Sequence, residues 1–323
     1  MKFGLSLALI LVAGPSLAQT VPGLAHLRDT SDDARPLSMS IWYPSEEKES
    51  GTVGGNPVFE GVAAAPDAEF TQSPLPLVVI SHGGLRSATD SGAWLSSSIA
   101  RAGFVVVEVN APRPDNAEAA VNEIWQRPQY ISRAIDLVLA DSTWGPRIDE
   151  TTVSVAGFAL GATAALSVVG AELDVASYLH SCAPDREPRG PDCGWFAAQG
   201  VDMSATNLDG LTGMARDPRV TSVIAINPEY SEDLGSAPAD VRALSISLGQ
   251  LARTSADGQQ APSFAMPQAS VFDAFAVCTF AGPKILMEEE GDASICGVSS
   301  DARRAIHQDV SNAVISFLNG SPE

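Results

Sequence analysis

Short apolar runs rich in valine recur along the chain, and amphipathic segments separate them. The runs lie at residues 75–80, 104–109, 153–156, 220–226 and 243–248. Because each run is nearly continuous, it is typical of a strand that is buried on both faces of a parallel sheet. Between the runs, apolar residues recur at helical spacing, as at Ile131, Ile135, Val138 and Leu139. This alternation predicts an α/β protein with a doubly wound, mostly parallel sheet.

Other stretches depart from that alternation. Residues 37–43 alternate apolar and polar side chains, which predicts a half-buried strand. Residues 45–74 are rich in Gly, Pro, Ala and acidic residues, and we expect a long surface loop there. Residues 171–218 contain several prolines and glycines but no long periodic run. We therefore predict a lid-like insertion at 171–218, above the carboxyl edge of the sheet, within a single domain that spans 19–323.

The sharpest local feature is a tight turn between a predicted strand and a predicted helix. The run at 153–156 leads into Gly-x-Ala-x-Gly at 157–161, and a stretch of small residues follows. Glycines at both ends of such a turn leave room where the backbones of strand and helix approach too closely for a Cβ atom. In hydrolases the same strand, turn and helix present the serine of Gly-x-Ser-x-Gly. Here Ala159 occupies the place of that serine.

Further segments extend this match to a resemblance that covers nearly the whole mature chain. Residues 35–44, Ser81-His82-Gly83-Gly84 and residues 303–307 resemble the opening strand, the oxyanion loop and the closing helix of the predicted dienelactone hydrolases of bacteria. That family is related to the plasma-type platelet-activating-factor acetylhydrolases. The resemblance implies an α/β-hydrolase fold and a Ser-His-Asp triad for carboxylic ester hydrolysis. It also implies that the histidine of the oxyanion loop is structural.

The resemblance places the triad at residues that carry no catalytic group. The nucleophile falls on Ala159, the acid after the strand at 244–248 falls on Ala252, and the histidine ahead of Cys278 falls on Val271. Alanine has no oxygen to attack a carbonyl group, and valine cannot accept a proton. Alanine at the acid position cannot orient an imidazole. An engineered serine replacement would explain residue 159 alone, so the loss at all three positions favours natural degeneration of the triad.

The resemblance also implies an oxyanion hole built from backbone N–H groups. Its donors would be Leu160 and one of Gly83, Gly84 or Leu85. Replacement of side chains elsewhere does not delete backbone donors, so we expect a pocket that binds an oxygen atom without turnover. Because no histidine remains at the triad position to change its charge, we expect ligand affinity to change little between pH 6 and pH 8.

The cysteines indicate disulfides. Four cysteines are present, and four allow three pairings. Cys182 and Cys193 enclose a short loop that contains Gly and Pro, and so do Cys278 and Cys296. We therefore predict these two local pairs. A metal site is the alternative, but no C-x-x-C spacing occurs, so we assign no metal ligands and expect no cofactor.

The first residues are typical of a secretory signal peptide. Lys2 supplies a positive start, residues 4–13 form a short apolar run, and Ser16-Leu17-Ala18 ends in small residues. We predict that 1–18 is removed and that the mature chain is periplasmic or secreted and has no membrane span, with a retained anchor as the alternative. The formal net charge of −20 argues against binding to nucleic acid or to an anionic lipid surface.

These features predict an exported pseudo-hydrolase that binds a small apolar or ester-like ligand, or a protein partner that the sequence does not identify. An active carboxylesterase or lactonase with an unrecognised nucleophile is the main alternative, and an engineered Ser-to-Ala variant of such an enzyme is related to it. A structural or interaction protein whose pocket has filled in is a third possibility. Ester hydrolysis distinguishes the enzyme from the others, and a ligand retained in the pocket distinguishes the binding protein from the structural one.

Overall fold

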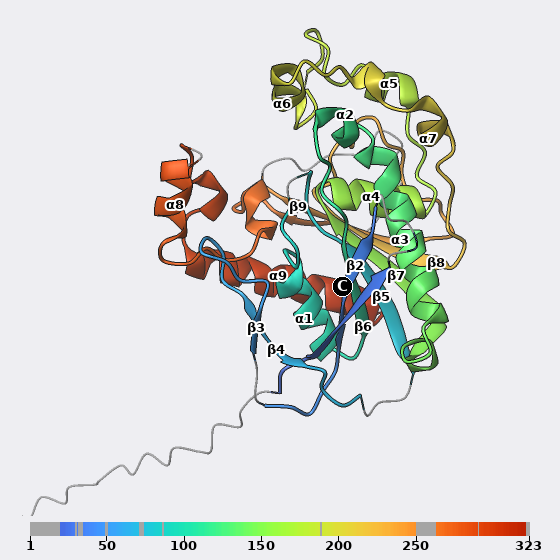
Figure 1. The fold of residues 1–323 in the computed structure, drawn as a ribbon, viewed down its shortest axis with the longest axis vertical. Helices are drawn as coiled ribbons and strands as arrows, with labels where there is room; N and C mark the ends of the chain where they lie inside the picture. Colours follow the sequence, from blue (N-terminus) through green and yellow to red (C-terminus); the bar gives the residue numbers. More distant parts are fainter. Residues whose placement is uncertain are drawn as a thin grey trace, which may run out of the picture.

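The computed structural model describes residues 20–29, 31, 35–48, 51–70, 74–85, 87–187, 189–249, 263–289 and 291–320. These residues form a ten-stranded sheet with helices on both of its faces (Figure 1). The predicted doubly wound, mostly parallel α/β fold is confirmed. The predicted signal peptide lies outside the described residues.

The sheet has a parallel centre and an antiparallel edge. Its strand order is β10-β9-β8-β7-β5-β6-β2-β1-β4-β3. From β10 to β6 every pair of neighbours is parallel, whereas β2 is antiparallel to both β6 and β1. The strands are β1 (Gly23–Asp29), β2 (Leu37–Tyr43), β3 (Gly51–Val53), β4 (Val62–Pro66), β5 (Leu75–Ser81), β6 (Val105–Asn110), β7 (Ile148–Phe158), β8 (Val220–Ile226), β9 (Arg242–Leu248) and β10 (Ser263–Met266).

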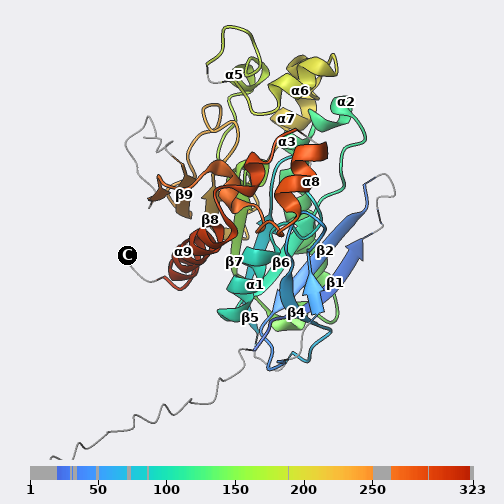
Figure 2. The same cartoon turned by 90° about the vertical axis from the view of Figure 1, so that its left-hand side faces the viewer.

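Four long helices cover the sheet. Helices α3 (Glu123–Ala140) and α4 (Leu160–Val168) pack on one face, and α1 (Ala93–Arg101) and α9 (Ser300–Leu318) pack on the other (Figure 2). The shorter helices are α2 (Ala117–Ala120), α5 (Val175–Leu179), α6 (Cys193–Ala198), α7 (Leu208–Thr212) and α8 (Gly282–Glu289). Single 3-10 turns are η1 (Gly145–Arg147), η2 (Met203–Ala205), η3 (Val271–Ala274) and η4 (Ser294–Cys296).

The valine-rich strands contribute to an apolar core on each face of the sheet. In β5, Leu77 and Val79 pack with α3 and α4, while Val78 and Ile80 pack with α1 and α9. All four side chains are buried. Successive residues of a strand point to opposite faces, so a strand covered on both sides needs an uninterrupted apolar sequence.

The expected surface loop at 45–74 is only partly a loop. It contains β3 and β4, which continue the sheet beyond β1. Strand β4 is parallel to β1, and β3 is antiparallel to β4. Strand β4 has the sequence Val-Ala-Ala-Ala-Pro, which shows neither a valine-rich run nor a polar–apolar alternation. Strand β4 pairs with β1 at only two positions, and β3 at the edge of the sheet is three residues long, so neither needs the apolar run of a strand buried on both faces. The loop prediction is therefore wrong for these two short strands.

The stretch at 171–218 forms the short helices α5, α6 and α7, which lie with α2 beyond one end of the sheet (Figure 1). One apolar cluster contains Tyr178 and Phe196 of these helices together with Leu85 after β5 and Leu160 at the start of α4. This cluster is separate from the two cores that cover the sheet. The residues predicted as the oxyanion loop and the helix start therefore form the floor beneath these helices.

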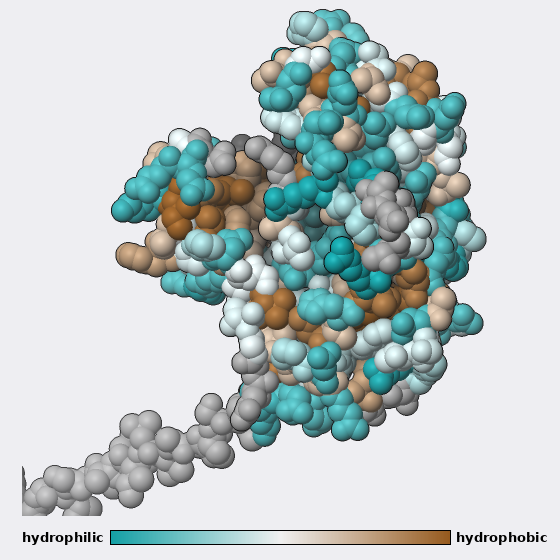
Figure 3. All heavy atoms as spheres, viewed as in Figure 1, coloured by the Kyte–Doolittle hydropathy of each residue, from teal (hydrophilic) through white to brown (hydrophobic). Residues whose placement is uncertain are grey.

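Both predicted disulfides are present. Cys182 pairs with Cys193, which ties the end of α5 to the start of α6. Cys278 pairs with Cys296, which ties the approach to α8 to η4. In Figure 3 the face of the molecule is largely hydrophilic, and apolar side chains gather over α8. Within the described ranges, no helix is both long and apolar enough to cross a membrane.

Candidate ligand-binding site

The turn between β7 and α4, predicted as a nucleophile elbow, has a strained backbone. Ala159 has φ 56° and ψ −126°, in a region that residues other than glycine rarely adopt. A Cβ atom on Gly157 would lie 2.2 Å from the Gly161 carbonyl oxygen, and one on Gly161 would lie 1.9 Å from that of Ser81. Both glycines are therefore required by close backbone contacts. An alanine held at a strained φ costs about 1–3 kcal/mol, which the surrounding structure must offset.

Hydrogen bonds from neighbouring elements hold Ala159 in this conformation. Its N–H donates to the Ile226 carbonyl oxygen at the end of β8, at 3.1 Å. Its own carbonyl oxygen accepts from the N–H groups of Thr163 and Glu229, at 3.2 and 3.3 Å. The Thr163 hydroxyl also donates to the Glu229 carbonyl oxygen at 2.5 Å. The elbow and the loop after β8 are therefore fastened to each other.

Arg127 of α3 orients the predicted oxyanion loop. Its Nη1 donates to the Gly83 carbonyl oxygen at 2.6 Å, and its Nη2 donates to the Gly84 carbonyl oxygen at 2.7 Å. Across a planar trans peptide, a carbonyl oxygen and the following N–H point in opposite directions. The N–H groups of Gly84 and Leu85 therefore point away from Arg127.

The candidate oxyanion donors differ in what they already bind. The N–H of Gly83 donates to the Phe158 carbonyl oxygen at 3.0 Å, so it is occupied within the fold. Leu160 is the first residue of α4, where the N–H has no acceptor in the preceding turn of the helix. Leu160, Gly84 and Leu85 therefore remain the donors that fit the prediction, and Gly84 lines the pocket described below.

Glu123 completes the support of the loop. Its Oε2 accepts from Arg127 Nε at 3.1 Å, and its Oε1 accepts from Arg35 at 2.5 Å. The Glu123 side chain is fully buried, and that of Arg127 is nearly so. A buried carboxylate between two guanidinium groups is compensated in charge, so it can hold Arg127 rigidly in place.

Val271, the predicted histidine position, opens the 3-10 turn η3. Its side chain is 42 % exposed, and it lines the same pocket as Ala159. Buried polar groups anchor the backbone of η3 from behind. His82 Nε2 and Trp94 Nε1 both donate to the Ala274 carbonyl oxygen, at 3.1 and 2.9 Å. The position is therefore fixed, but it carries a branched aliphatic side chain that can neither accept nor donate a proton.

The two histidines nearest this turn are structural in their contacts. His82 binds a carbonyl oxygen through Nε2 and the Ser91 hydroxyl through Nδ1, at 3.0 Å. His307 Nε2 lies 2.9 Å from the Asp273 carbonyl oxygen, and its ring stacks on Trp94. Burial lowers the pKa of both imidazoles to about 4, so both are neutral at pH 7. Both histidines therefore hold the backbone of this turn in place.

The predicted acid position, Ala252, lies outside the described residues. Asn227 is the first residue after β8, and it lines the pocket. Its amide group donates to the Leu248 carbonyl oxygen and accepts from the Leu248 N–H, at 3.1 and 2.7 Å. Asn227 therefore joins the ends of β8 and β9 and has a structural role.

The sequence analysis missed Glu229, which is the third residue after β8. Burial, with a smaller effect from Asp192, raises the pKa of its carboxyl group to about 8, although Arg127 opposes the shift. Its Oε2 is buried and has no hydrogen-bond partner. Its Oε1 lies 3.3 Å from the position that a Cβ atom on Gly84 would take. A polar residue at the carboxyl end of a central parallel strand is the signal that could have identified it.

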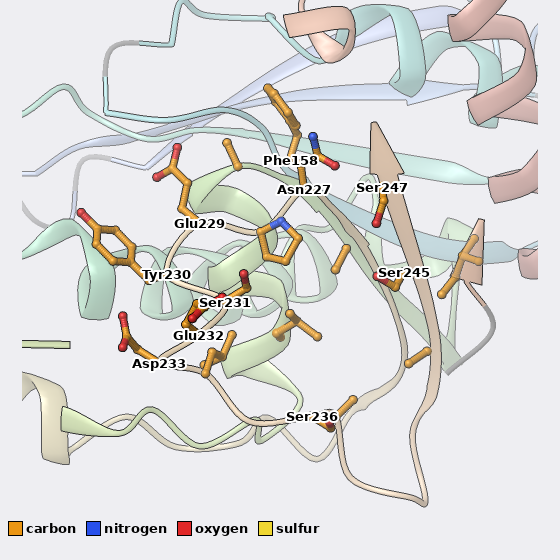
Figure 4. A pocket seen from close by; sticks show the side chains of 18 of the residues that line it. Phe158, Asn227, Glu229, Tyr230, Ser231, Glu232, Asp233, Ser236, Ser245 and Ser247 are labelled. Atoms are coloured by element: carbon orange, nitrogen blue, oxygen red, sulfur yellow. The ribbon is translucent and has the colours of Figure 1, made fainter. Parts of the chain in front are cut away.

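The elbow opens into a pocket of about 1500 Å³. Phe158, Phe272 and Phe275 supply apolar wall, while Glu229 and Tyr230 lie on the opposite side from the β9 serines (Figure 4). This volume exceeds what most small-molecule sites occupy, so the elbow is one end of a larger cleft. Among the residues that the structure describes, no group of three or more His, Cys, Asp or Glu side chains is arranged to hold a metal ion.

No protein-family model matches this chain. No curated protein matches it either. Among solved structures, the chain is similar to a ferulic acid esterase from Streptomyces cinnamoneus, with a TM-score of 0.59 and 15% sequence identity over 97% of this chain and 94% of that chain. At this identity the likeness concerns the fold alone. This chain has an α/β-hydrolase fold of the kind found in an esterase.

Proposed function

We propose that the protein binds a small ligand with an apolar body and one oxygen atom at the elbow, and that it does not hydrolyse esters through residue 159. The observation that carries the proposal is Ala159 itself. It has the backbone conformation of a nucleophile elbow and lines the pocket, yet its side chain is a methyl group. The strained backbone is therefore kept although residue 159 lacks the hydroxyl group that this turn presents in a hydrolase.

The surroundings of the elbow favour binding. Gly84 and Leu160 offer backbone N–H groups beside the methyl group of Ala159, and phenylalanine side chains line the cleft nearby. In a comparable triad, loss of the nucleophile costs about 10⁶ in rate, while the oxyanion hole and binding alone retain about 10³ over water. A site with donors but no nucleophile is therefore suited to holding a ligand rather than turning it over.

The family proposal follows from the same residues. We propose that the protein is a relative of the predicted dienelactone hydrolases and has lost its triad. The strand, turn and helix around Ala159 and the loop at Ser81–Gly84 support this proposal. The two disulfides support a location in an oxidising compartment, the periplasm or the medium, which agrees with the predicted signal peptide. An active esterase with another nucleophile is the competing function, and the esterase-like fold is the observation in its favour.

Titration calorimetry against an uncharged carbonyl compound tests the binding proposal. We use 2-heptanone, a ketone that cannot be hydrolysed, so that binding is measured without turnover. Ala159→Phe should abolish binding because the larger side chain fills the elbow, whereas Ala302→Phe on the exposed start of α9 should bind like the parent. Circular dichroism checks that both variants fold. Equal binding by folded Ala159→Phe would contradict a ligand site at the elbow.

A further inference from the structure

Glu229 places a carboxyl group in the pocket beside Gly84, where the sequence analysis expected no acid. We infer that Glu229, in its neutral form, is a hydrogen-bond donor beside Gly84 and Leu160, and that it restricts the elbow to uncharged carbonyl compounds such as esters, lactones and ketones. This inference rests on the proposed binding function and specifies the ligand class.

The position of Glu229 is fixed by its backbone. Its N–H donates to the Ala159 carbonyl oxygen, and its carbonyl oxygen accepts from the Thr163 hydroxyl. The side chain lines the pocket next to Gly84, with Oε2 buried and without a hydrogen-bond partner. A buried carboxyl oxygen left without a partner costs free energy, and a ligand that supplies the partner recovers it.

Four ionisable groups among the described residues face Glu229. They are Arg127 on α3, Asp192 before α6, and the phenols of Tyr178 on α5 and of Tyr230 beside it in the chain. Arg127 is the cation among them, but its three nitrogen atoms are directed at Glu123 and at the carbonyl oxygens of the oxyanion loop. Burial of the carboxyl group, with a smaller effect from Asp192, disfavours a carboxylate, so the proton remains on Glu229 at pH 7.

A neutral carboxyl group selects among ligand charges. Its O–H can donate to a ligand carbonyl oxygen, as a backbone N–H group does. A carboxylate ligand at the elbow would lie near Asp192, while Arg127 is already bound to Glu123 and to the carbonyl oxygens of Gly83 and Gly84. Burial of a charge that is not paired is costly. An ammonium ligand would meet the positive end of α4 and backbone donors instead of acceptors. Uncharged carbonyl compounds therefore fit best.

Titration calorimetry at pH 6 and pH 9 tests this inference with three probes of similar length: 2-heptanone, hexanoate and hexylamine. Only the neutral form of Glu229 binds, and its population falls above a pKa of about 8. The affinity of the wild-type protein for 2-heptanone should therefore be roughly tenfold lower at pH 9 than at pH 6. At pH 6, hexanoate and hexylamine should bind at least about tenfold more weakly than the ketone.

Three variants separate the role of Glu229 from a general effect of pH. Glu229→Gln keeps a neutral donor, so it should bind 2-heptanone as the wild type does at pH 6 and lose the pH dependence. Glu229→Leu removes the donor and should bind weakly at both pH values. Glu232→Gln, a neighbouring pocket residue, should keep the wild-type pH dependence.

The results that would overturn the inference differ from those that would overturn elbow binding. Tighter binding of hexanoate or hexylamine, a flat pH profile in the wild type, or an unchanged profile in Glu229→Gln would overturn the inference and leave elbow binding intact. Failure of all three probes to bind the wild-type protein would overturn elbow binding, and the inference with it.

Discussion

The backbone N–H of Glu229 donates to the carbonyl oxygen of Ala159 at 3.3 Å. This contact brings the loop after β8 against the elbow after β7, so that a carboxyl group stands beside the site that lacks a serine. The expectation that ligand affinity is flat between pH 6 and pH 8 considered histidine alone. With a carboxyl pKa of about 8 at the elbow, the affinity should begin to fall near the top of that range.

Restoring the triad should require more than the serine. Ala159→Ser alone should remain inactive, because a serine hydroxyl needs a base to remove its proton at neutral pH. Ala159→Ser with Val271→His and Ala252→Asp should give measurable hydrolysis of an activated aryl ester. The matched control is Ala159→Ser combined with Phe280→His. Its new histidine lies at a fully exposed position outside the pocket. Equal rates for the single and triple variants would show that the assigned base and acid are wrong.

The prediction of the fold succeeded where strands are buried on both faces. The runs that became β5, β6 and β8 are apolar because both of their faces pack against helices. Strands β1 and β4 were missed because neither has such a run, and both contain exposed or half-buried positions.

The candidate site was predictable only in part. The elbow and the oxyanion loop have local motifs, so Ala159 and Gly84 could be found from the sequence. Arg127 and Glu229 carry no local motif, and their roles arise from contacts with residues of other elements. Such contacts depend on how the elements pack, which spacing along a single sequence does not reveal.

Removal of the Arg127 side chain should destabilise the protein. Arg127→Ala leaves buried Glu123 with only Arg35 and frees the carbonyl oxygens of Gly83 and Gly84. Breaking a buried ion pair in this way costs about 3–5 kcal/mol. Chemical denaturation should show this loss in the free energy of unfolding.

The matched control for that variant is Arg216→Ala. Arg216 pairs with Asp240 on the surface, and such pairs contribute less than about 1 kcal/mol. A similar loss in both arginine variants would contradict the special role assigned to Arg127.

Stability should fall as the pH rises from 7 to 8.5. Burial raises the pKa of Glu108 to about 8 and that of Glu229 to about the same value, so both bind a proton in the folded state that they lack in the unfolded state. Their contribution is full below the unfolded pKa of about 4.5 and is lost as the pH passes through about 8. Denaturation curves across this range should show the fall, and Glu108→Gln should reduce it.

The two buried histidines, His82 and His307, should make stability fall as the pH is lowered. Folding lowers the pKa of His82 and His307 to about 4, so their contribution is full above about 6.5 and is lost as the pH falls through about 4. The variant His307→Gln should therefore lose less stability than the parent between pH 5 and pH 4. A steeper loss in that variant would contradict a buried neutral imidazole.

Each disulfide should stabilise the folded state mainly by restricting the unfolded chain. The cysteines are separated by 11 and 18 residues, and loops of this size correspond to about 3 kcal/mol each. Replacing the pair at 182 and 193 by serine should lower the free energy of unfolding by that amount, and the pair at 278 and 296 should behave similarly. Peptide mapping without reductant should recover these two pairs, and crossed pairs would contradict the assignment.

The most direct test of the central claim is labelling of the intact protein with a fluorophosphonate probe, followed by mass spectrometry. Such probes react with an activated serine, and Ala159 offers no hydroxyl group at the elbow. We predict that no serine is labelled stoichiometrically and that aryl esters are cleaved no faster than by a denatured control. Stoichiometric labelling of any serine would contradict a binding pocket without a nucleophile and would identify the residue of an active esterase.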